Sequence, residues 1–320
     1  MVAGRQRSKE MFSSINESEV SMNVENLKIT FIGLGEAATA LISGWGKAHN
    51  RKITAYDIKL NATETRSEIA FRAQSLGITY VNTIKESLAQ ADVVFSTVTA
   101  DQALQAARSS APYVKAGTYW FDLNSCAPDS KKQAAALLEK HSARYVDVAV
   151  MAPVYPKQNL VPLLISGRWA PRVASFLETL PMRPRIIEGS VGKASAIKMV
   201  RSIMVKGLEA LTAECTLAAA AADVADEVFP SLKAAHPFID VPKRSIYNFE
   251  RSMSHGIRRA AEMHEVAKML DGLGLPNDMS TATAQWQKRL ANKTDEDIAI
   301  EDANDLHAFS NILMPRVRSF

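Results

Sequence analysis

The chain has 320 residues, of which 47% are hydrophobic and 22% charged, and its formal net charge is +4. This length is more than one compact core needs and is ample for two domains. The apolar residues form no uninterrupted run long enough to span a membrane, and no basic run with interleaved aromatic residues is present. We therefore expect neither a membrane nor a nucleic acid as a partner. A small anionic substrate and an anionic cofactor account for the mild positive charge equally well.

The cysteines and the first 26 residues bear on the cellular setting. Cys126 and Cys215 lie far apart and match no metal spacing, so we expect no metal site and no disulfide framework, and a cytoplasmic location fits. Residues 1–26 begin with basic side chains but have no apolar run behind them, which argues against a secretory signal. Four glutamates in the same segment argue against a mitochondrial presequence. We expect this segment to be a disordered leader.

A glycine turn follows the first apolar run of the chain and leads into an alanine-rich helix. In the pattern G-x-G-x-x-G/A, Gly33 would make the tight turn, Gly35 would let the backbone approach a pyrophosphate, and Ala38 would let the helix pack closely on the strand. A single match of this kind is weak, because any strand-turn-helix corner favours glycine. The cofactor-binding residues predicted from this turn are Gly33, Leu34, Gly35, Glu36 and Ala37.

An acidic residue stands where a dinucleotide site expects one. Asp57 follows a second apolar segment, twenty-two residues after Gly35. Its carboxylate would accept hydrogen bonds from the adenosine ribose of NAD and would repel the 2′-phosphate of NADP. Lys59 and Arg66 are close enough in sequence to offset that repulsion and readmit NADP, and Asp57 could instead cap the next turn. We predict NAD as the cofactor, with NADP as the alternative.

Strand and helix patterns alternate up to about residue 190. Near-continuous apolar strands of this kind predict a parallel sheet wound by right-handed crossovers, which is a Rossmann-type doubly wound α/β domain over residues 27–190. Thr97, Val98 and Thr99 end a buried strand at the sheet edge where ligands bind, and we predict that they contact the cofactor; alternatively, the threonines only cap the next helix. From Gly192 onward only helical patterns appear, so residues 191–320 should form an all-helical domain for substrate binding and dimerisation.

Three segments resemble the β-hydroxyacid dehydrogenases, the group that includes hydroxyisobutyrate and phosphogluconate dehydrogenases. The turn at 32–35 matches the cofactor fingerprint of that family, residues 122–128 resemble its substrate loop D-x-S-T-x-x-P, and residues 192–198 resemble its catalytic segment G-x-G-x-x-x-K. Residues 251–263 are similar to a shorter C-terminal domain of unknown function in one branch of the superfamily. The resemblance covers most of residues 27–290. It implies an oxidoreductase in which Lys198 is the catalytic lysine.

The chain departs from the family pattern at three places. The S-G-G of the family is replaced by Met151-Ala152-Pro153, which alters the backbone cradle that usually holds a substrate carboxylate. Ser202 stands where the family has an asparagine after the catalytic lysine, and in the substrate loop the family's serine and threonine fall on Asn124 and Ser125. The resemblance therefore implies the fold and the lysine but leaves the substrate open.

Lys198 is the predicted acid/base. Removing a hydride from a carbinol carbon requires a base that takes the hydroxyl proton. A lysine that is desolvated beside the cationic nicotinamide ring would have its pKa lowered toward working pH. Asn124 and Ser125 would hydrogen-bond the substrate from the opposite loop, so both are predicted as catalytic and substrate-binding residues. On a later helix His255, Arg258, Arg259 and Glu262 form one polar stripe, which either holds an anion or is a solvated or dimer-interface face. The remaining predicted substrate-binding residues are Met151, Ser202, His255 and Arg258.

The function predicted from these residues is an NAD(P)-dependent dehydrogenase of a β-hydroxyacid or a related small polar alcohol. Two alternatives remain. One is an imine or amino-acid-type reductase on the same scaffold, against which Lys198 argues because that family usually has an aspartate or tyrosine there. The other is a dinucleotide-binding protein without turnover, which the altered loop at Met151 leaves open. We also expect a homodimer, because the helical region carries more apolar residues than it can bury.

Overall fold

The N-terminal half of the molecule is built around one twisted sheet. The computed structural model describes residues 27–46, 52–235, 240–291 and 306–318, so the predicted leader at 1–26 lies outside the described residues. Eight strands lie in the order β3-β2-β1-β4-β5-β6-β7-β8. Neighbouring strands are parallel except for β6 and β7, which pair antiparallel. The strands are β1 (Ile29–Ile32), β2 (Ile53–Tyr56), β3 (Thr79–Tyr80), β4 (Val93–Ser96), β5 (Tyr119–Asp122), β6 (Arg144–Val150), β7 (Pro162–Ser166) and β8 (Arg183–Ile186).

The central strands are buried on both faces, as their apolar sequences predicted. Phe31, Phe95 and Phe121 stand at paired register positions of β1, β4 and β5. Their rings stack, with centroids 5.2 Å apart between the first pair and 5.0 Å between the second. Trp45 packs against two of these rings from the first helix, and all four side chains belong to one hydrophobic cluster. This cluster holds the carboxyl ends of β1, β4 and β5 in fixed positions.

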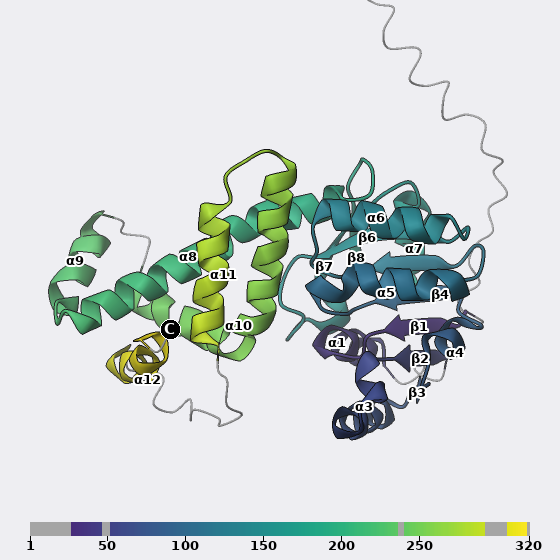
Figure 1. Cartoon of the computed structure of the whole chain (residues 1–320), viewed down its shortest axis with the longest axis horizontal. Coiled ribbons are helices and arrows are strands. Elements are labelled where there is room, and N and C mark those ends of the chain that lie inside the picture. Colours follow the sequence, from purple (N-terminus) through teal and green to yellow (C-terminus); the bar gives the residue numbers. More distant parts are fainter. Residues whose placement is uncertain (1–26, 47–51, 236–239, 292–305, 319–320) are drawn as a thin grey trace, which may run out of the picture.

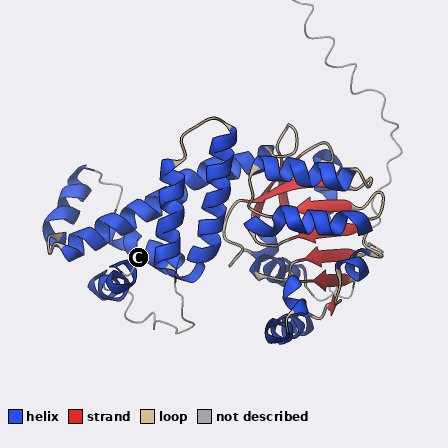
Figure 2. Ribbon diagram, viewed as in Figure 1, coloured by secondary structure: helices blue, strands red, loops and turns tan. Residues whose placement is uncertain are grey.

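Helices surround this sheet, and Figure 2 shows them in blue around the red strands. They are α1 (Glu36–Trp45), α3 (Thr63–Leu76), α4 (Ile84–Leu88), α5 (Ala103–Ser110), α6 (Pro128–Glu139) and α7 (Ala170–Thr179). Short 3-10 turns lie at η3 (Ile58–Asn61), η4 (Ala100–Gln102), η5 (Ala111–Tyr113) and η6 (Gln158–Leu160).

All regular secondary structure in the described part of the C-terminal half is helical. Its elements are α8 (Lys193–Ala221), α9 (Ala225–Ala235), α10 (Val241–Gly272), α11 (Asp278–Leu290) and α12 (Leu306–Arg318). A helix the length of α8 spans about 43 Å, and it leads away from the sheet with α10 and α11 beside it (Figure 1). No helix among the described residues is long and apolar enough to cross a membrane. The predicted fold, a Rossmann-type sheet followed by helices, is confirmed.

Candidate cofactor and active site

A cavity of about 540 Å³ opens where the strand order reverses between β1 and β4. In open α/β sheets, ligands bind at this switch point, beyond the carboxyl ends of the strands. The turn after β1 and the ends of β2, β4 and β5 form one side of the cavity, and α8 and α10 contribute to the other. Most of the predicted site residues line it, namely Gly33, Gly35, Glu36, Ala37, Asp57, Thr97, Val98, Thr99, Asn124, Ser125, Lys198 and Arg258.

The glycine turn has the geometry that a dinucleotide phosphate needs. Gly33 has a φ of +92°, and a Cβ there would come within 2.8 Å of the carbonyl oxygen of Thr97. A Cβ on Gly35, by contrast, would meet no atom within 4 Å, so the absence of a side chain keeps the cavity clear at the start of α1. Gly35 is also the N-cap and has no side chain to satisfy the first N–H groups of the helix. The turn therefore fits an anionic diphosphate.

Asp57 is held at the end of β2 by two backbone N–H groups. Its Oδ2 accepts from the N–H of Leu34 at 2.8 Å, and its Oδ1 accepts from the N–H of Lys59 at 2.9 Å. The carboxylate remains on the cavity wall and is partly exposed. Leu34 itself, predicted as a cofactor residue, is fully buried. Its contribution is the hydrogen bond to Asp57, because its side chain packs into the core below the turn.

Asn124 is fixed by the end of the neighbouring strands. Its Nδ2 donates to Oδ1 of Asp122 at 2.8 Å and to the hydroxyl of Ser96 at 2.9 Å, so the orientation of the amide is determined. Its Oδ1 is buried and has no hydrogen-bond partner among the described residues. An unsatisfied buried acceptor is costly. This oxygen, on a residue that lines the cavity, fits an N–H or O–H group of a bound cofactor or substrate.

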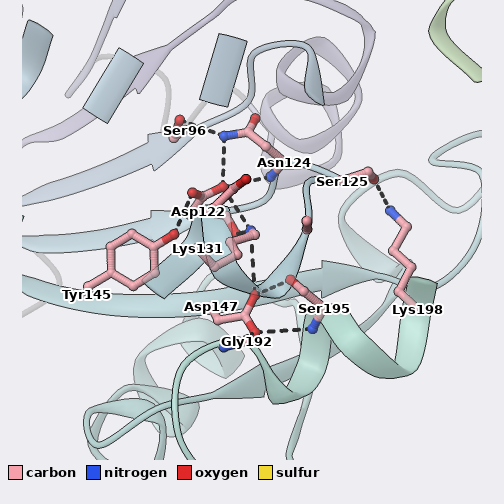
Figure 3. A network of polar contacts seen from close by, with 12 residues as sticks. Ser96, Asp122, Asn124, Ser125, Lys131, Tyr145, Asp147, Gly192, Ser195 and Lys198 are labelled. Carbon is pink, nitrogen blue, oxygen red and sulfur yellow. Dashed lines mark hydrogen bonds and ion pairs between the residues drawn. The ribbon is translucent and has the colours of Figure 1, made fainter. Parts of the chain in front are cut away.

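Lys198 reaches across the cavity from α8 to the loop after β5. Figure 3 shows its ammonium directed at the hydroxyl of Ser125, to which it donates a short hydrogen bond. Desolvation is the main cause that lowers the pKa of Lys198, to about 8, and nearby Lys206, Lys131 and Arg258 contribute in the same direction. Glu262 opposes the change. A partly buried lysine whose pKa lies near neutrality can act both as a base and as an acid.

Glu262 is a cavity residue that the sequence presented only as one member of a polar stripe. It lies on α10, lines the cavity and forms an ion pair with Lys206. Burial alone would raise its pKa, but Lys206, Lys198 and Arg258 outweigh burial and lower it to about 2. The site therefore contains a permanent negative charge beside its lysine. The sequence signal that could have identified Glu262 was its spacing of four residues from Arg258, because residues four apart share one helix face.

The polar stripe on α10 divides between two environments. Arg258 and Glu262 line the cavity, whereas Arg259 is buried, forms an ion pair with Glu209 and donates to Gln287 at 3.2 Å. His255 is not among the cavity residues, since it lies one turn earlier on α10. Its predicted place in the substrate site therefore stays a prediction.

Met151 and Ser202 also lie off the cavity wall. The N–H of Met151 donates to the carbonyl of Pro162 at 2.9 Å, and its side chain packs on a small apolar cluster beside α8. Pro153 lines the cavity but has no N–H, so two of the three backbone donors in this loop cannot hold a carboxylate. Ser202 is buried on α8 one turn beyond Lys198 and is not among the cavity residues.

Among the residues that the structure describes, no group of three or more histidine, cysteine, aspartate or glutamate side chains could hold a metal ion. The sheet topology and the cavity together define a Rossmann-type NAD(P)-binding scaffold with a lysine at its centre.

Comparisons with known proteins agree with this class. Residues 28–155 match the NAD-binding domain of 6-phosphogluconate dehydrogenase, and residues 219–290 match a domain of unknown function, DUF1932. The chain therefore belongs to the β-hydroxyacid dehydrogenase superfamily, in the branch that joins these two domains.

Three relatives illustrate the range of similarity. A conserved hypothetical protein from Sinorhizobium meliloti 1021 is 32% identical, with 92% of this chain and 99% of that chain covered and a TM-score of 0.69. An uncharacterized 28.5 kDa protein in the 7S RNA 5′ region of Methanothermus fervidus is 27% identical, over 82% of this chain and 99% of its own length. The 3-hydroxyisobutyrate dehydrogenase of Mycobacterium tuberculosis is 16% identical, over 90% of this chain and 98% of its own, with a TM-score of 0.65. This last likeness shows the fold alone.

Proposed function

We propose that the protein is an NAD(P)-dependent dehydrogenase that acts on the alcohol carbon of a β-hydroxyacid or a related small polar alcohol. One observation carries the proposal. The desolvated ammonium of Lys198 lies against the hydroxyl of Ser125 in the same cavity that the glycine turn and Asp57 line. The fold supports the proposal, since a 3-hydroxyisobutyrate dehydrogenase shares it.

Lys198 would manage the proton of the substrate hydroxyl. When bound, the nicotinamide cofactor supplies the hydride acceptor or donor. In the oxidation direction the neutral amine of Lys198 takes the hydroxyl proton, and in the reduction direction its ammonium returns that proton. Ser125 would hold the lysine and the substrate oxygen in one geometry, because its hydroxyl already contacts the Lys198 amine. The depressed pKa of Lys198, about 8, supports both roles.

Arg258 and Asn124 would orient the substrate. Arg258 lines the cavity from α10, and its exposed guanidinium is suited to a carboxylate or another anion. Asn124 offers an unpaired oxygen to a donor group. The loop at Met151 has lost most of its backbone donors, so Arg258 rather than that loop is proposed to bind an acidic substrate group.

Asp57 supports NAD as the preferred cofactor. Its carboxylate lies on the cavity wall at the end of β2, where it would accept hydrogen bonds from ribose hydroxyls and repel a 2′-phosphate. Lys59 also lines the cavity, and its ammonium lies 3.5 Å from Glu68, so its charge is partly offset. NADP therefore remains the second candidate.

A substrate panel tests the proposed function. The full chain is assayed for formation of NADH and NADPH with short β-hydroxyacids, and for their consumption with the matching semialdehydes and with cyclic imines. Turnover of a hydroxyacid that is lost in Lys198→Ala is the expected result. Turnover of imines alone would favour the reductase alternative. Tight cofactor binding with no hydride transfer across the panel would contradict the proposal and favour a binding protein.

A further inference from the structure

A single buried ammonium connects the two sides of the candidate site. Lys131 lies on the first turn of α6, and its side chain has no exposed surface. Its Nζ lies 2.6 Å from the carbonyl oxygen of Asp122, 2.9 Å from Oδ1 of the same residue and 3.5 Å from Oδ1 of Asp147. The two contacts with Asp122 are hydrogen bonds, and the contact with Asp147 is an ion pair. Asp122 and Asp147 belong to adjacent strands, β5 and β6, so Lys131 joins two carboxylates at one edge of the sheet (Figure 3).

The first carboxylate, Asp122, holds the substrate loop. Its Oδ1 accepts from both the backbone N–H and the Nδ2 of Asn124, at 2.9 and 2.8 Å. Its Oδ2 accepts from the hydroxyl of Tyr145 at 2.6 Å. Burial and the Asp122 carboxylate raise the pKa of Tyr145 well above its ordinary value, so the phenol stays protonated and keeps donating. The hydrogen bonds to Asp122 therefore fix the conformation of Asn124 and, with it, the position of Ser125, the next residue.

The second carboxylate, Asp147, holds the start of the lysine helix. Its Oδ2 accepts from the N–H of Gly192 at 3.0 Å and from the N–H of Ser195 at 3.1 Å, and its Oδ1 accepts from the Ser195 hydroxyl at 2.5 Å. Gly192 is the N-cap of α8 and offers no capping side chain, so Asp147 caps the helix from another strand. Lys198 follows Ser195 by less than one turn, and its direction depends on this cap.

We infer that Lys131 is a positioning residue. By orienting Asp122 and Asp147 together, it fixes the position of the substrate loop, which carries Asn124 and Ser125, relative to the start of α8, which carries Lys198. The inference rests on the proposed function of Lys198 for its catalytic consequence, but the geometry itself does not depend on the substrate. A buried ion network of this type contributes little net stability compared with apolar side chains of the same size, and its best-attested use is to fix a register. Burial favours the neutral amine, yet the Asp122 carboxylate raises the pKa of Lys131, so the charge persists.

The charge of Lys131 also reaches Lys198. Lys131 is one of the cations that lower the pKa of Lys198, together with Lys206 on α8 and Arg258 on α10, while Glu262 on α10 acts in the opposite direction. Removing the charge of Lys131 should therefore raise the pKa of Lys198. Loss of register should act in the same direction, because a lysine that moves into solvent returns toward its ordinary pKa.

Competitive acetylation tests this without a substrate. The full chain is labelled with acetic anhydride over a pH series, and the apparent pKa of Lys198 is read from peptide masses in wild type, Lys131→Met and the matched control Lys132→Met. Lys132 is the next residue on α6, is exposed and forms an ion pair with exposed Asp129. We expect the Lys198 pKa to rise in Lys131→Met and to stay unchanged in the control. Where a substrate is in hand, kcat should fall by about 10- to 100-fold, because small displacements of a reacting group carry losses of that size.

A milder variant covers the case in which Lys131→Met does not fold. Ser195→Ala removes one contact to Asp147 and keeps every charge, and Thr216→Val removes a buried hydroxyl from the same helix far from the cavity. Ser195→Ala should raise the Lys198 pKa, and Thr216→Val should not. A Lys198 pKa that is the same as wild type in the folded Lys131→Met chain, or in Ser195→Ala, overturns the inference. If no hydroxyacid is turned over but the Lys198 pKa still rises in these variants, only the proposed function is refuted.

Discussion

Nη2 of Arg258 lies 3.5 Å from Oε2 of Glu36, so an ion pair joins the helical domain to the first residue of α1. Both side chains are about half exposed and both line the cavity. Glu36 stands directly after the glycine turn, where the phosphates of a dinucleotide would lie, and its charge opposes theirs.

This pair predicts opposite effects of its two members on cofactor affinity. Glu36→Gln should tighten NAD binding several-fold, because a negative charge leaves the phosphate site and Arg258 is released. Arg258→Gln should weaken binding by a similar factor, since Glu36 is left uncompensated; exposed pairs contribute roughly 0.2–1 kcal/mol. Titration calorimetry at low and high salt measures both, and salt should reduce both effects. Equal affinities in the two variants would show that the pair does not act on the cofactor.

Lys198→Ala should lower kcat by about 10²–10⁴, the usual contribution of general acid-base catalysis. NAD affinity should barely change, because the proposed cofactor contacts at the glycine turn and Asp57 do not involve Lys198. Lys198→Arg should not restore activity, since a guanidinium stays protonated at neutral pH. Steady-state kinetics and NAD titration of the three proteins give the comparison. A Lys198→Ala enzyme that binds NAD and turns over at the wild-type rate would remove the lysine from the mechanism.

The rate of alcohol oxidation should follow the titration of Lys198. In the proposed mechanism the neutral amine of Lys198 is the base, and burial lowers its pKa to about 8, so kcat/KM should rise with pH up to that region and level above it. Carbonyl reduction requires the ammonium and should fall over the same range. Glu262 raises the pKa of Lys198, so Glu262→Gln should move both profiles to lower pH. Profiles that keep their midpoint in Glu262→Gln would assign the titration to another group.

Asp57 should make NAD the preferred cofactor by kcat/KM. Asp57→Ser removes the charge and should improve the relative use of NADP by roughly five-fold or more, because repulsion of a phosphate at close range is worth about 1 kcal/mol or more. The same change should weaken NAD binding, because the shorter serine side chain replaces the Asp57 carboxylate that accepts a hydrogen bond from the Leu34 N–H in the glycine turn. Equal or better kcat/KM with NADP in the wild type would contradict this assignment.

The long helix α8 supports the predicted homodimer. Its exposed apolar residues recur at a spacing of three or four, which places them along one face, and they are Ile197, Val200, Met204, Leu208 and Leu211. Helix α9 buries none of its residues among the described part of the chain. A Met204→Glu/Leu211→Glu chain should sediment as a monomer and the wild type as a dimer at micromolar concentration. A monomeric wild type would refute the prediction.

The fold and the cofactor turn of the cavity could be predicted from the sequence alone, because these signals are local. A strand, two glycines and a following acid define the cofactor turn within thirty residues, and a glycine followed by Lys198 marks the start of α8. These spacings follow from backbone geometry and need no knowledge of packing. The N–H of Leu34 and the carboxylate of Asp57 meet for the same reason, since adjacent parallel strands end at one edge.

The tertiary structure decided which face of each helix the cavity uses. Ser202 and His255 lie on correctly predicted helices, but each lies about one turn from a cavity residue of its helix, Lys198 or Arg258. The apolar pattern of a helix does not show which of its turns faces a cavity formed with another domain. Glu262 acquired its role from Lys206, fifty-six residues earlier in the chain. Lys131 looked like an ordinary residue in a helical turn, and only burial between the ends of two strands gave its charge two partners. Such roles depend on desolvation and on contacts between distant segments, which packing alone creates.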